Sequence, residues 1–415
     1  MSKPACLGGS PVTKNILEKS DFTFRRDLER KYLLEVYESR VWDDWPDEES
    51  MASVFRKEWA EFNGSNYCAL LTNGTHTLQV ALETLDIGYG DEVIVPGITW
   101  QATASAVCDV NAVPVLVDVD PETLCIDPQK VEEAITANTR AIIPVHLYHR
   151  MADLDRLLPI VDKHNLFMVE DCAHTHGSQW NCKAAGTFGD FGSFSFQSSK
   201  LMTGGEGGAL LMQDEVNYWK VVSQKSCGRE YKPGVRLHSG NYRMTGFQAA
   251  VLRGQLAALK HNAPIMDRNG LALDRAVAEA PGVKPLRRNE HITRQCGYSY
   301  VFLYDREFYD GLELTDFRRA LSEELGFEFD TAYTPLSHSE LYTPHYKKRH
   351  HLNKAYLQAI TPSRWHLPVA DDLWQNKAVV GLWQLYGCPP DRAKLLTDAI
   401  TKIYANRHEL MKASK

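Results

Sequence analysis

The middle of this chain reads Phe194-Ser-Phe-Gln-Ser-Ser-Lys-Leu-Met-Thr-Gly-Gly-Glu-Gly-Gly208. The stretch joins an apolar strand end to serine hydroxyls, one lysine and four glycines around Glu206. Glycines after Lys200 can take φ > 0 and let a bulky ligand lie against the backbone. A lysine between a strand and a tight turn suits Schiff-base chemistry, because a partly desolvated amine is more often neutral and nucleophilic. A surface lysine beside a glycine-rich hairpin is the alternative, and this stretch alone favours neither interpretation.

The chain before this stretch alternates short apolar runs with helical segments. Strands that are apolar on both faces and alternate with helices predict an α/β fold with a mostly parallel central sheet covered by helices. Two shorter apolar pieces, residues 193–196 and 209–212, are expected to extend that sheet. The other expected strands are residues 68–72, 93–95, 115–117, 141–143 and 167–169, and the expected helices lie around 101–110, 128–135 and 152–164.

The pattern changes near residue 265. A strand with Tyr298, Tyr300, Phe302 and Tyr304 on one face, followed by helices at 316–325 and 391–406, predicts a smaller α+β domain. We therefore expect three parts. They are an N-terminal lead-in (residues 1–50), a large domain (51–265) and a small C-terminal domain (266–415). The lead-in, with a helix around 25–40 and an acidic segment at 43–49, is expected to pack on the core or on a partner subunit.

Composition excludes several classes of protein. The net charge of −7 argues against a nucleic-acid-binding protein. No apolar run approaches the ~20 residues of a membrane span, and the N-terminus lacks the apolar core of a signal peptide. The nine cysteines contain no Cys-x-x-Cys pair, which favours reduced thiols over a disulfide framework or a zinc site. We expect a cytoplasmic protein that binds neither nucleic acid nor membranes.

Polar side chains follow the expected strands where ligands of such sheets bind, beyond the carboxyl ends. Asn73-Gly-Thr75 lies between a strand and a helix, so its free N–H groups and the positive helix end attract an anion. Gly74 permits close approach, and Thr75 can cap the helix or bind a phosphate. A capping turn without a ligand is the alternative.

Four features at this sheet edge match the needs of pyridoxal phosphate (PLP). The phosphate needs N–H donors such as those of residues 73–75, and the ring benefits from an aromatic face such as Trp100. The pyridine nitrogen needs a carboxylate, here Asp171, and the aldehyde needs an amine, here Lys200. A carboxylate beside the pyridinium keeps the ring cationic, so that it accepts electrons when a substrate Cα–H bond breaks.

Three motifs resemble the DegT/DnrJ/EryC1/StrS aminotransferases: Glu170-Asp-Cys-Ala-His-Thr-His-Gly177, residues 192–208 and Asn241-Tyr-Arg-Met244. The resemblance covers essentially the whole chain and implies a PLP enzyme of fold type I, like aspartate aminotransferase, acting on keto-sugars or keto-cyclitols. Gln197-Ser-Ser-Lys-Leu-Met-Thr203 is most similar to the glutamine:scyllo-inosose and 2-deoxy-scyllo-inosose aminotransferases of aminoglycoside antibiotic biosynthesis. The alternatives are a nucleotide keto-sugar aminotransferase using glutamate and an enzyme like 3-amino-5-hydroxybenzoate synthase.

The resemblance also implies roles for individual residues. Lys200 would form the internal aldimine with PLP and shuttle the proton, and its presence favours transamination, since dehydratases of the family carry histidine there. Asp171 would pair with the pyridine nitrogen, and His174 would lie by the ring oxygen. Trp100 would stack on the ring. The implied phosphate contacts are Gly74, Thr75 and Ser195, with Asn241 reaching in from the second subunit of a homodimer that shares the active site.

His149 departs from the family, which usually has glycine at this position. An imidazole here could narrow the pocket, contact a substrate hydroxyl or point to solvent. Weaker candidates for contact with the amino donor or the keto acceptor are Tyr148, Arg243, Tyr333 and His338, for which ordinary packing is the alternative. His174 and His176 could suggest a metal pair, but no carboxylate or cysteine completes a ligand set at useful spacing. We therefore expect no metal.

Overall fold

The computed structural model describes residues 2–43 and 48–413, so part of the predicted acidic segment, residues 44–47, lies outside the described residues. Its centre is a seven-stranded sheet with the strand order β1-β9-β8-β5-β4-β2-β3. β9 is antiparallel to both of its neighbours, and the remaining pairs are parallel. The predicted α/β fold with a mostly parallel sheet is confirmed. The strands are β1 (Tyr67–Leu71), β2 (Glu92–Pro96), β3 (Val113–Val117), β4 (Thr139–Ile142), β5 (Phe167–Asp171), β8 (Phe191–Ser195) and β9 (Gly208–Met212).

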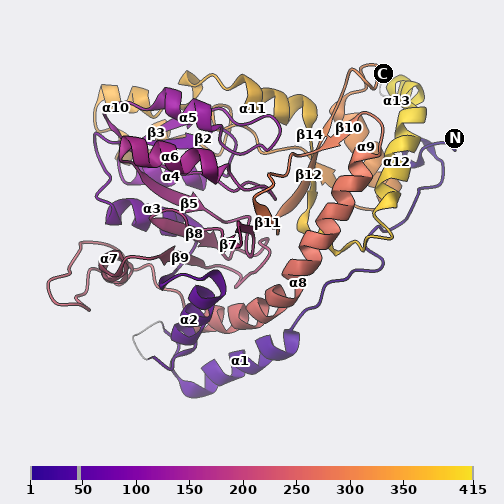
Figure 1. Ribbon diagram of the computed structural model, residues 1–415. Helices are drawn as coiled ribbons and strands as arrows, with labels where there is room; N and C mark the ends of the chain where they lie inside the picture. The colour runs from indigo at the N-terminus through magenta and orange to yellow at the C-terminus, as the bar shows by residue number, and fades with distance from the viewer. Residues whose placement is uncertain (1, 44–47, 414–415) are drawn as a thin grey trace.

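Helices precede, connect and follow these strands, and most of them pack against the sheet (Figure 1). Each forms where the sequence repeats apolar residues at helical spacing, and several begin at an Asn or Asp side chain that caps the first turn. They are α2 (Met51–Asn63), α3 (Gly74–Thr84), α4 (Ala102–Asp109), α5 (Pro128–Ala134), α6 (Leu154–His164), α7 (Glu215–Lys225) and α8 (Gly246–Ala278).

α8 passes straight through the predicted boundary between residues 265 and 266. It leads into a four-stranded antiparallel sheet with the order β10-β12-β14-β13. The second strand of this sheet, β12 (Ser299–Tyr304), is buried on both faces. The sequence pattern indicates one apolar face only, the one with the aromatic residues. The other elements here are β10 (Val283–Pro285), α9 (Leu314–Leu325), β13 (Phe329–Asp330), α10 (Lys354–Ala359), α11 (Pro368–Asp372), β14 (Ala378–Leu382), α12 (Lys394–Ala405) and α13 (Arg407–Ala413).

A third, small sheet links the two parts of the chain. β6 (Gln179–Trp180) pairs with both β7 (Lys183–Ala184) and β11 (Ile292–Arg294). This sheet was not predicted, because two- and three-residue strands are too short to leave a periodic pattern in the sequence. It brings the segment that follows β5 next to the segment that leads into β12, and both segments contribute to the site described below.

The N-terminal lead-in packs on the rest of the chain. α1 (Arg26–Ser39) lies alongside the first part of α8, as Figure 1 shows. The first residues of the lead-in are held by the buried carboxylate of Glu324. This carboxylate accepts hydrogen bonds from the backbone N–H groups of Ala5 and Val12 and pairs with Lys402 at 2.9 Å. The lead-in therefore packs on the core of its own chain, which is the first of the two predicted arrangements.

The structure also bears on the cysteines and on the predicted lack of a membrane span. None of the nine cysteines forms a disulfide, and six of them are buried. In the part of the chain that the structure describes, no helix combines the length and the apolar character that a membrane crossing requires.

Candidate active site

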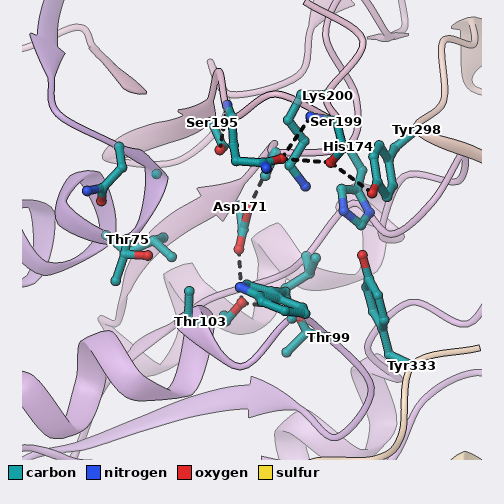
Figure 2. A pocket seen from close by; sticks show the side chains of 18 of the residues that line it. Thr75, Thr99, Thr103, Asp171, His174, Ser195, Ser199, Lys200, Tyr298 and Tyr333 are labelled. Atoms are coloured by element: carbon teal, nitrogen blue, oxygen red, sulfur yellow. Dashed lines mark hydrogen bonds between the residues drawn. The ribbon is translucent and has the colours of Figure 1, made fainter. Parts of the chain in front are cut away.

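The carboxyl ends of the parallel strands face a cavity of about 300 Å³ (Figure 2). Its walls come from the turn after β1, the start of α4, the end of β5 and the glycine-rich stretch after β8. Two tyrosines from the C-terminal part close it. The structure brings eight sequence-predicted residues together here: Gly74, Thr75, Trp100, Asp171, His174, Ser195, Lys200 and Tyr333.

One end of the cavity is the N-terminus of α3. The Asn73 side chain caps this helix by accepting a 2.9 Å hydrogen bond from the backbone of His76, so Thr75 is not the cap and instead lines the cavity. A Cβ atom added at Gly74 would lie 2.7 Å from the Cβ of Ser195, so only glycine lets α3 start this close to β8. The first N–H groups of the helix therefore remain for an anion.

Asp171, the last residue of β5, places a carboxylate in the middle of the cavity. It accepts hydrogen bonds from the Thr103 hydroxyl at 2.9 Å and from the backbone N–H of Ala173 at 3.1 Å. Thr103 is in turn 2.9 Å from the hydroxyl of Thr99. Burial raises the pKa of Asp171, and these hydrogen bonds and the charge of Lys200 oppose the rise. A cation bound against this carboxylate would favour its charged form.

Lys200 supplies an amine to the wall of the same cavity (Figure 2). Its Nζ lies over the ring of Tyr298, 4.3 Å from the centroid. Burial lowers the pKa of Lys200 to about 8, against the opposing effect of the Asp171 charge. A much larger fraction of this amine is therefore neutral near pH 7–8 than for an ordinary lysine with a pKa of ~10.4. It is the partly desolvated lysine that the strand-and-turn setting predicts.

His174 is buried and neutral. Its Nδ1 accepts a 3.1 Å hydrogen bond from the backbone N–H of Tyr148, so the ring proton is on Nε2. The imidazole stacks on the ring of Tyr298, with the two centroids 4.3 Å apart. Burial and the nearby charge of Lys200 hold the pKa of His174 well below its usual value. The site therefore contains a histidine that can donate a hydrogen bond through Nε2 but carries no charge near neutral pH.

Several residues of the cavity wall were missed from the sequence. Thr103 lies in the first turn of α4, and Thr99 lies just before that helix, so two hydroxyls that close together ahead of an expected helix are a readable signal. Tyr298 was assigned to one face of a strand, yet it lies just before β12 and turns into the cavity, where its hydroxyl is 3.1 Å from that of Ser199. Gln197 and Glu206 also line the wall.

Two predicted substrate contacts lie behind the wall and not in the cavity. Tyr148 is 2% exposed, and its hydroxyl accepts a hydrogen bond from the backbone of Tyr333. His149 is 1% exposed and stacks on Tyr300, with the ring centroids 5.2 Å apart. It neither narrows the pocket nor points to solvent, because Tyr148 takes a left-handed φ of 56° that turns the next residue into the core. We no longer expect either side chain to touch the substrate.

Three other predicted residues lie outside the cavity of this chain. Asn241 and Arg243 are on the segment between α7 and α8, which forms isolated bridges to Ser226 and Leu71. His338 is 3.3 Å from Asp371 and lines an adjoining groove of about 430 Å³. This groove, the outer groove, shares Thr99, Trp100 and Tyr333 with the cavity; its other lining residues are Gln101, Thr334, His338, Ser339, Glu340, Leu341 and Trp374.

A buried group of possible metal ligands lies beneath the site: His146, Glu170 and Cys172. The Glu170 carboxylate already accepts hydrogen bonds from three backbone N–H groups and from Nε2 of His146 at 3.0 Å. Nδ1 of His146 accepts from the backbone of Ala152. Because the lone pairs are engaged in this way, the group is a structural network and does not suit a metal ion. His176 is likewise engaged, donating through Nε2 to the Ser195 carbonyl.

The residues present fit PLP. The glycine-lined start of α3 can take a phosphate, and the buried Asp171 carboxylate needs a cationic partner such as a protonated pyridine nitrogen. Trp100 is an aromatic side chain that remains 47% exposed on the wall of the cavity. Lys200 is an amine with a lowered pKa, and His174 has an Nε2 proton to donate.

Comparisons with known proteins agree with this chemistry. A sequence model of the DegT/DnrJ/EryC1/StrS aminotransferase family matches residues 26–381. The L-glutamine:2-deoxy-scyllo-inosose aminotransferase of Streptomyces kanamyceticus is 38% identical over 372 residues, 86% of either chain. The enzyme of the same name from Streptoalloteichus tenebrarius is 37% identical over 374 residues, 87% of this chain and 88% of its own. Among solved structures, 3-amino-5-hydroxybenzoic acid synthase superposes with a TM-score of 0.79 at 28% identity and covers 94% of this chain and 100% of its own.

Proposed function

Because the chain belongs to the DegT/DnrJ/EryC1/StrS aminotransferase family, we propose that it is a PLP-dependent aminotransferase that moves the amino group of L-glutamine to a keto-cyclitol. The acceptor class is scyllo-inosose or 2-deoxy-scyllo-inosose, and the products are aminocyclitols. The observation that carries the proposal is the meeting of a desolvated amine, Lys200, with a buried carboxylate, Asp171, in one cavity beside a helix N-terminus.

Each residue has a task in this proposal. Lys200 would hold the cofactor through Nζ. As a free amine, the same Nζ would take the proton from the Cα of the donor and return a proton to the acceptor carbon. A pKa of about 8 suits both directions of this transfer, because the amine can gain and lose a proton near neutral pH. When bound, PLP supplies the aldehyde that carries the amino group and a ring that withdraws electrons from the breaking Cα–H bond.

The remaining residues orient the cofactor. Asp171, held by Thr103 and Ala173, would keep a proton on the ring nitrogen of PLP. His174 would donate a hydrogen bond from Nε2 to an oxygen of the ring, since its Nδ1 is occupied by the backbone of Tyr148. Trp100 would offer a face for stacking. The N–H groups at the start of α3, with Ser195, would bind the phosphate.

The charges of the walls favour an uncharged acceptor. Among the described residues that line the cavity, Lys200 is the one lysine or arginine. The residues of the outer groove include neither, and Glu340 adds a negative charge. A sugar nucleotide would bring a diphosphate that needs cationic partners, whereas a keto-cyclitol needs hydrogen bonds and an aromatic face. The two relatives named above, at 37–38% identity, are 2-deoxy-scyllo-inosose aminotransferases, which supports the same acceptor class.

We also propose that the enzyme works as a homodimer with shared active sites. The segment between α7 and α8 extends away from the body of the chain in Figure 1, and Asn241 and Arg243 lie where it returns, in bridges to Ser226 and Leu71. The lead-in exposes large apolar side chains, with Leu34 50%, Tyr37 55% and Trp42 42% exposed. A second copy that covers this apolar surface could receive Asn241 in its phosphate site.

The test follows the visible absorption band of the PLP-loaded protein. L-Glutamine should bleach the band, and scyllo-inosose added after removal of glutamine should restore it. Restoration only by a nucleotide keto-sugar would overturn the acceptor class while leaving the aminotransferase assignment. Lys200→Ala is the control, and a Lys200→Ala protein that still transferred the amino group at full rate would refute the role of Lys200.

A further inference from the structure

Tyr148 makes an unusual set of contacts for a residue outside the cavity. It is buried and has a φ of 56°, a left-handed conformation that is unfavourable for a tyrosine. Such a conformation persists where the surrounding structure fixes it, and these positions cluster at functional sites. Three cavity-lining residues, His174, Tyr298 and Tyr333, contact Tyr148, and they come from three separate segments of the chain.

The backbone of Tyr148 binds two of them. Its N–H donates to Nδ1 of His174 at 3.1 Å, and its carbonyl accepts from the N–H of Tyr298 at 2.7 Å. The first bond sets the tautomer of His174, so that the proton is on Nε2. The second places the Tyr298 ring, over which Nζ of Lys200 lies at 4.3 Å.

The side chain of Tyr148 binds the third residue. Its hydroxyl accepts a 2.8 Å hydrogen bond from the N–H of Tyr333. Its ring packs against the rings of Tyr333, 5.4 Å between centroids, and His174, 5.9 Å between centroids. Tyr333 is one of the residues that line both the cavity and the outer groove, so this bond fixes the backbone of a residue that lies between them.

The residue after Tyr148 anchors it from behind. His149 stacks on Tyr300 and packs against Gly297, where an added Cβ would lie 2.2 Å from the Cβ of His149. Gly297 directly precedes Tyr298, so the chain that enters the cavity is held against the chain that carries Tyr148. This packing explains how the left-handed conformation of Tyr148 is maintained.

From these contacts we propose that Tyr148 is a positioning residue, whose hydroxyl holds Tyr333 and thereby sets the passage that the acceptor uses. The proposal rests on the proposed aminotransferase function. Tyr148 itself does not touch the substrate in this proposal. A change in the hydroxyl should therefore alter acceptor binding more than it alters cofactor binding or the reaction with glutamine.

The test compares Tyr148→Phe with Tyr309→Phe. Both variants remove a buried hydroxyl that is bonded to backbone, since the Tyr309 hydroxyl donates to the Pro281 carbonyl at 3.0 Å, remote from the cavity. Tyr148→Phe should raise the KM for the keto-cyclitol about fivefold to tenfold, because the Tyr333 N–H loses its acceptor and Tyr333 shifts. The rate of bleaching by glutamine should change less than about twofold, and Tyr309→Phe should leave both values unaltered.

A second readout uses the cofactor-free protein and does not depend on activity. Hydrogen exchange at the Tyr333 amide should be about tenfold faster in Tyr148→Phe and unchanged in Tyr309→Phe. Equal exchange and equal KM in the two variants would overturn the proposal, and faster exchange with an unchanged KM would overturn its functional part. A wild-type protein that glutamine fails to bleach would instead refute the proposed function, while exchange still tests the bond.

Discussion

The hydroxyl of Thr103 donates a 2.9 Å hydrogen bond to Oδ2 of Asp171, which joins the first turn of α4 to the end of β5. The hydroxyl of Thr99, which lies just before α4, is 2.9 Å from that of Thr103 and supports it. The carboxylate thus has a fixed orientation before any cofactor arrives. Burial would otherwise favour its neutral form, because it raises the pKa of Asp171. The two threonines therefore help to keep an anion where a protonated ring nitrogen is to be bound.

Thr103→Val should lower kcat about tenfold, because Asp171 loses a hydrogen bond that favours its charged form. PLP should still bind. The matched control is Thr84→Val, which removes a buried hydroxyl bonded to the Val80 carbonyl within α3. Steady-state kinetics of both variants make the comparison, and equal kcat values would contradict the role of Thr103.

Asp171→Asn should retain PLP but lose about 10²- to 10³-fold in kcat, since an amide cannot hold the ring nitrogen in its cationic form. Cofactor content, measured by absorbance after gel filtration, separates loss of binding from loss of rate. A variant with a normal rate and full cofactor content would show that Asp171 does not face the ring nitrogen.

The attachment of PLP should depend on pH through Lys200. Only the neutral amine attacks an aldehyde, and the pKa of Lys200 is lowered to about 8. The rate of reconstitution of the cofactor-free protein should therefore rise with pH up to about 8 and then level off, whereas an ordinary lysine would continue to rise toward pH ~10. In Asp171→Asn the plateau should begin at a lower pH, because the Asp171 charge raises the pKa of Lys200. A wild-type rate that climbs steadily past pH ~10 would contradict the lowered pKa.

The buried histidines should make stability fall in mild acid. Burial holds the pKa of His149 well below 6.5, so the folded state stays neutral where the unfolded state binds a proton. The free energy of unfolding is therefore not reduced by this group above about pH 6.5, and it decreases as the pH falls below that value. His149→Leu should reduce the slope of unfolding free energy against pH by about 1.4 kcal/mol per pH unit below pH ~6. Urea unfolding of the cofactor-free proteins measures this slope, and identical slopes would show that His149 is protonated in the folded state.

A shared active site predicts complementation between two inactive variants. Asn241→Asp should be inactive because its carboxylate repels the phosphate, and Lys200→Ala lacks the amine. In a mixed dimer one site has both wild-type residues, so refolding the variants together should restore about a quarter of wild-type activity. Each variant refolded alone is the control. Activity that stays at the level of the controls would place Lys200 and Asn241 in the same chain's site or exclude the dimer.

Much of the fold and of the site could be predicted from local sequence. The strands around residues 68–72 and 167–169 are short apolar runs, and the helices between them repeat apolar residues at helical spacing. Chain geometry then requires Asp171 and the turn at Gly74 to meet at the same edge, because the carboxyl ends of parallel strands lie together. Lys200 was identifiable for the same reason, since it lies in the short stretch that follows β8, which ends at Ser195.

The contacts of Tyr148, His149 and Tyr298 were decided only by the tertiary structure. Tyr148 and His149 follow a strand end just as Asp171 does, so the sequence pattern placed them in the site. The left-handed φ of Tyr148 depends on hydrogen bonds to residues 26 and 150 positions away, and it turns His149 into the core. Local sequence determines which residues lie at the sheet edge. Which of them enter the cavity is decided by packing between distant segments, because only that packing supplies the energy to hold an unfavourable backbone conformation.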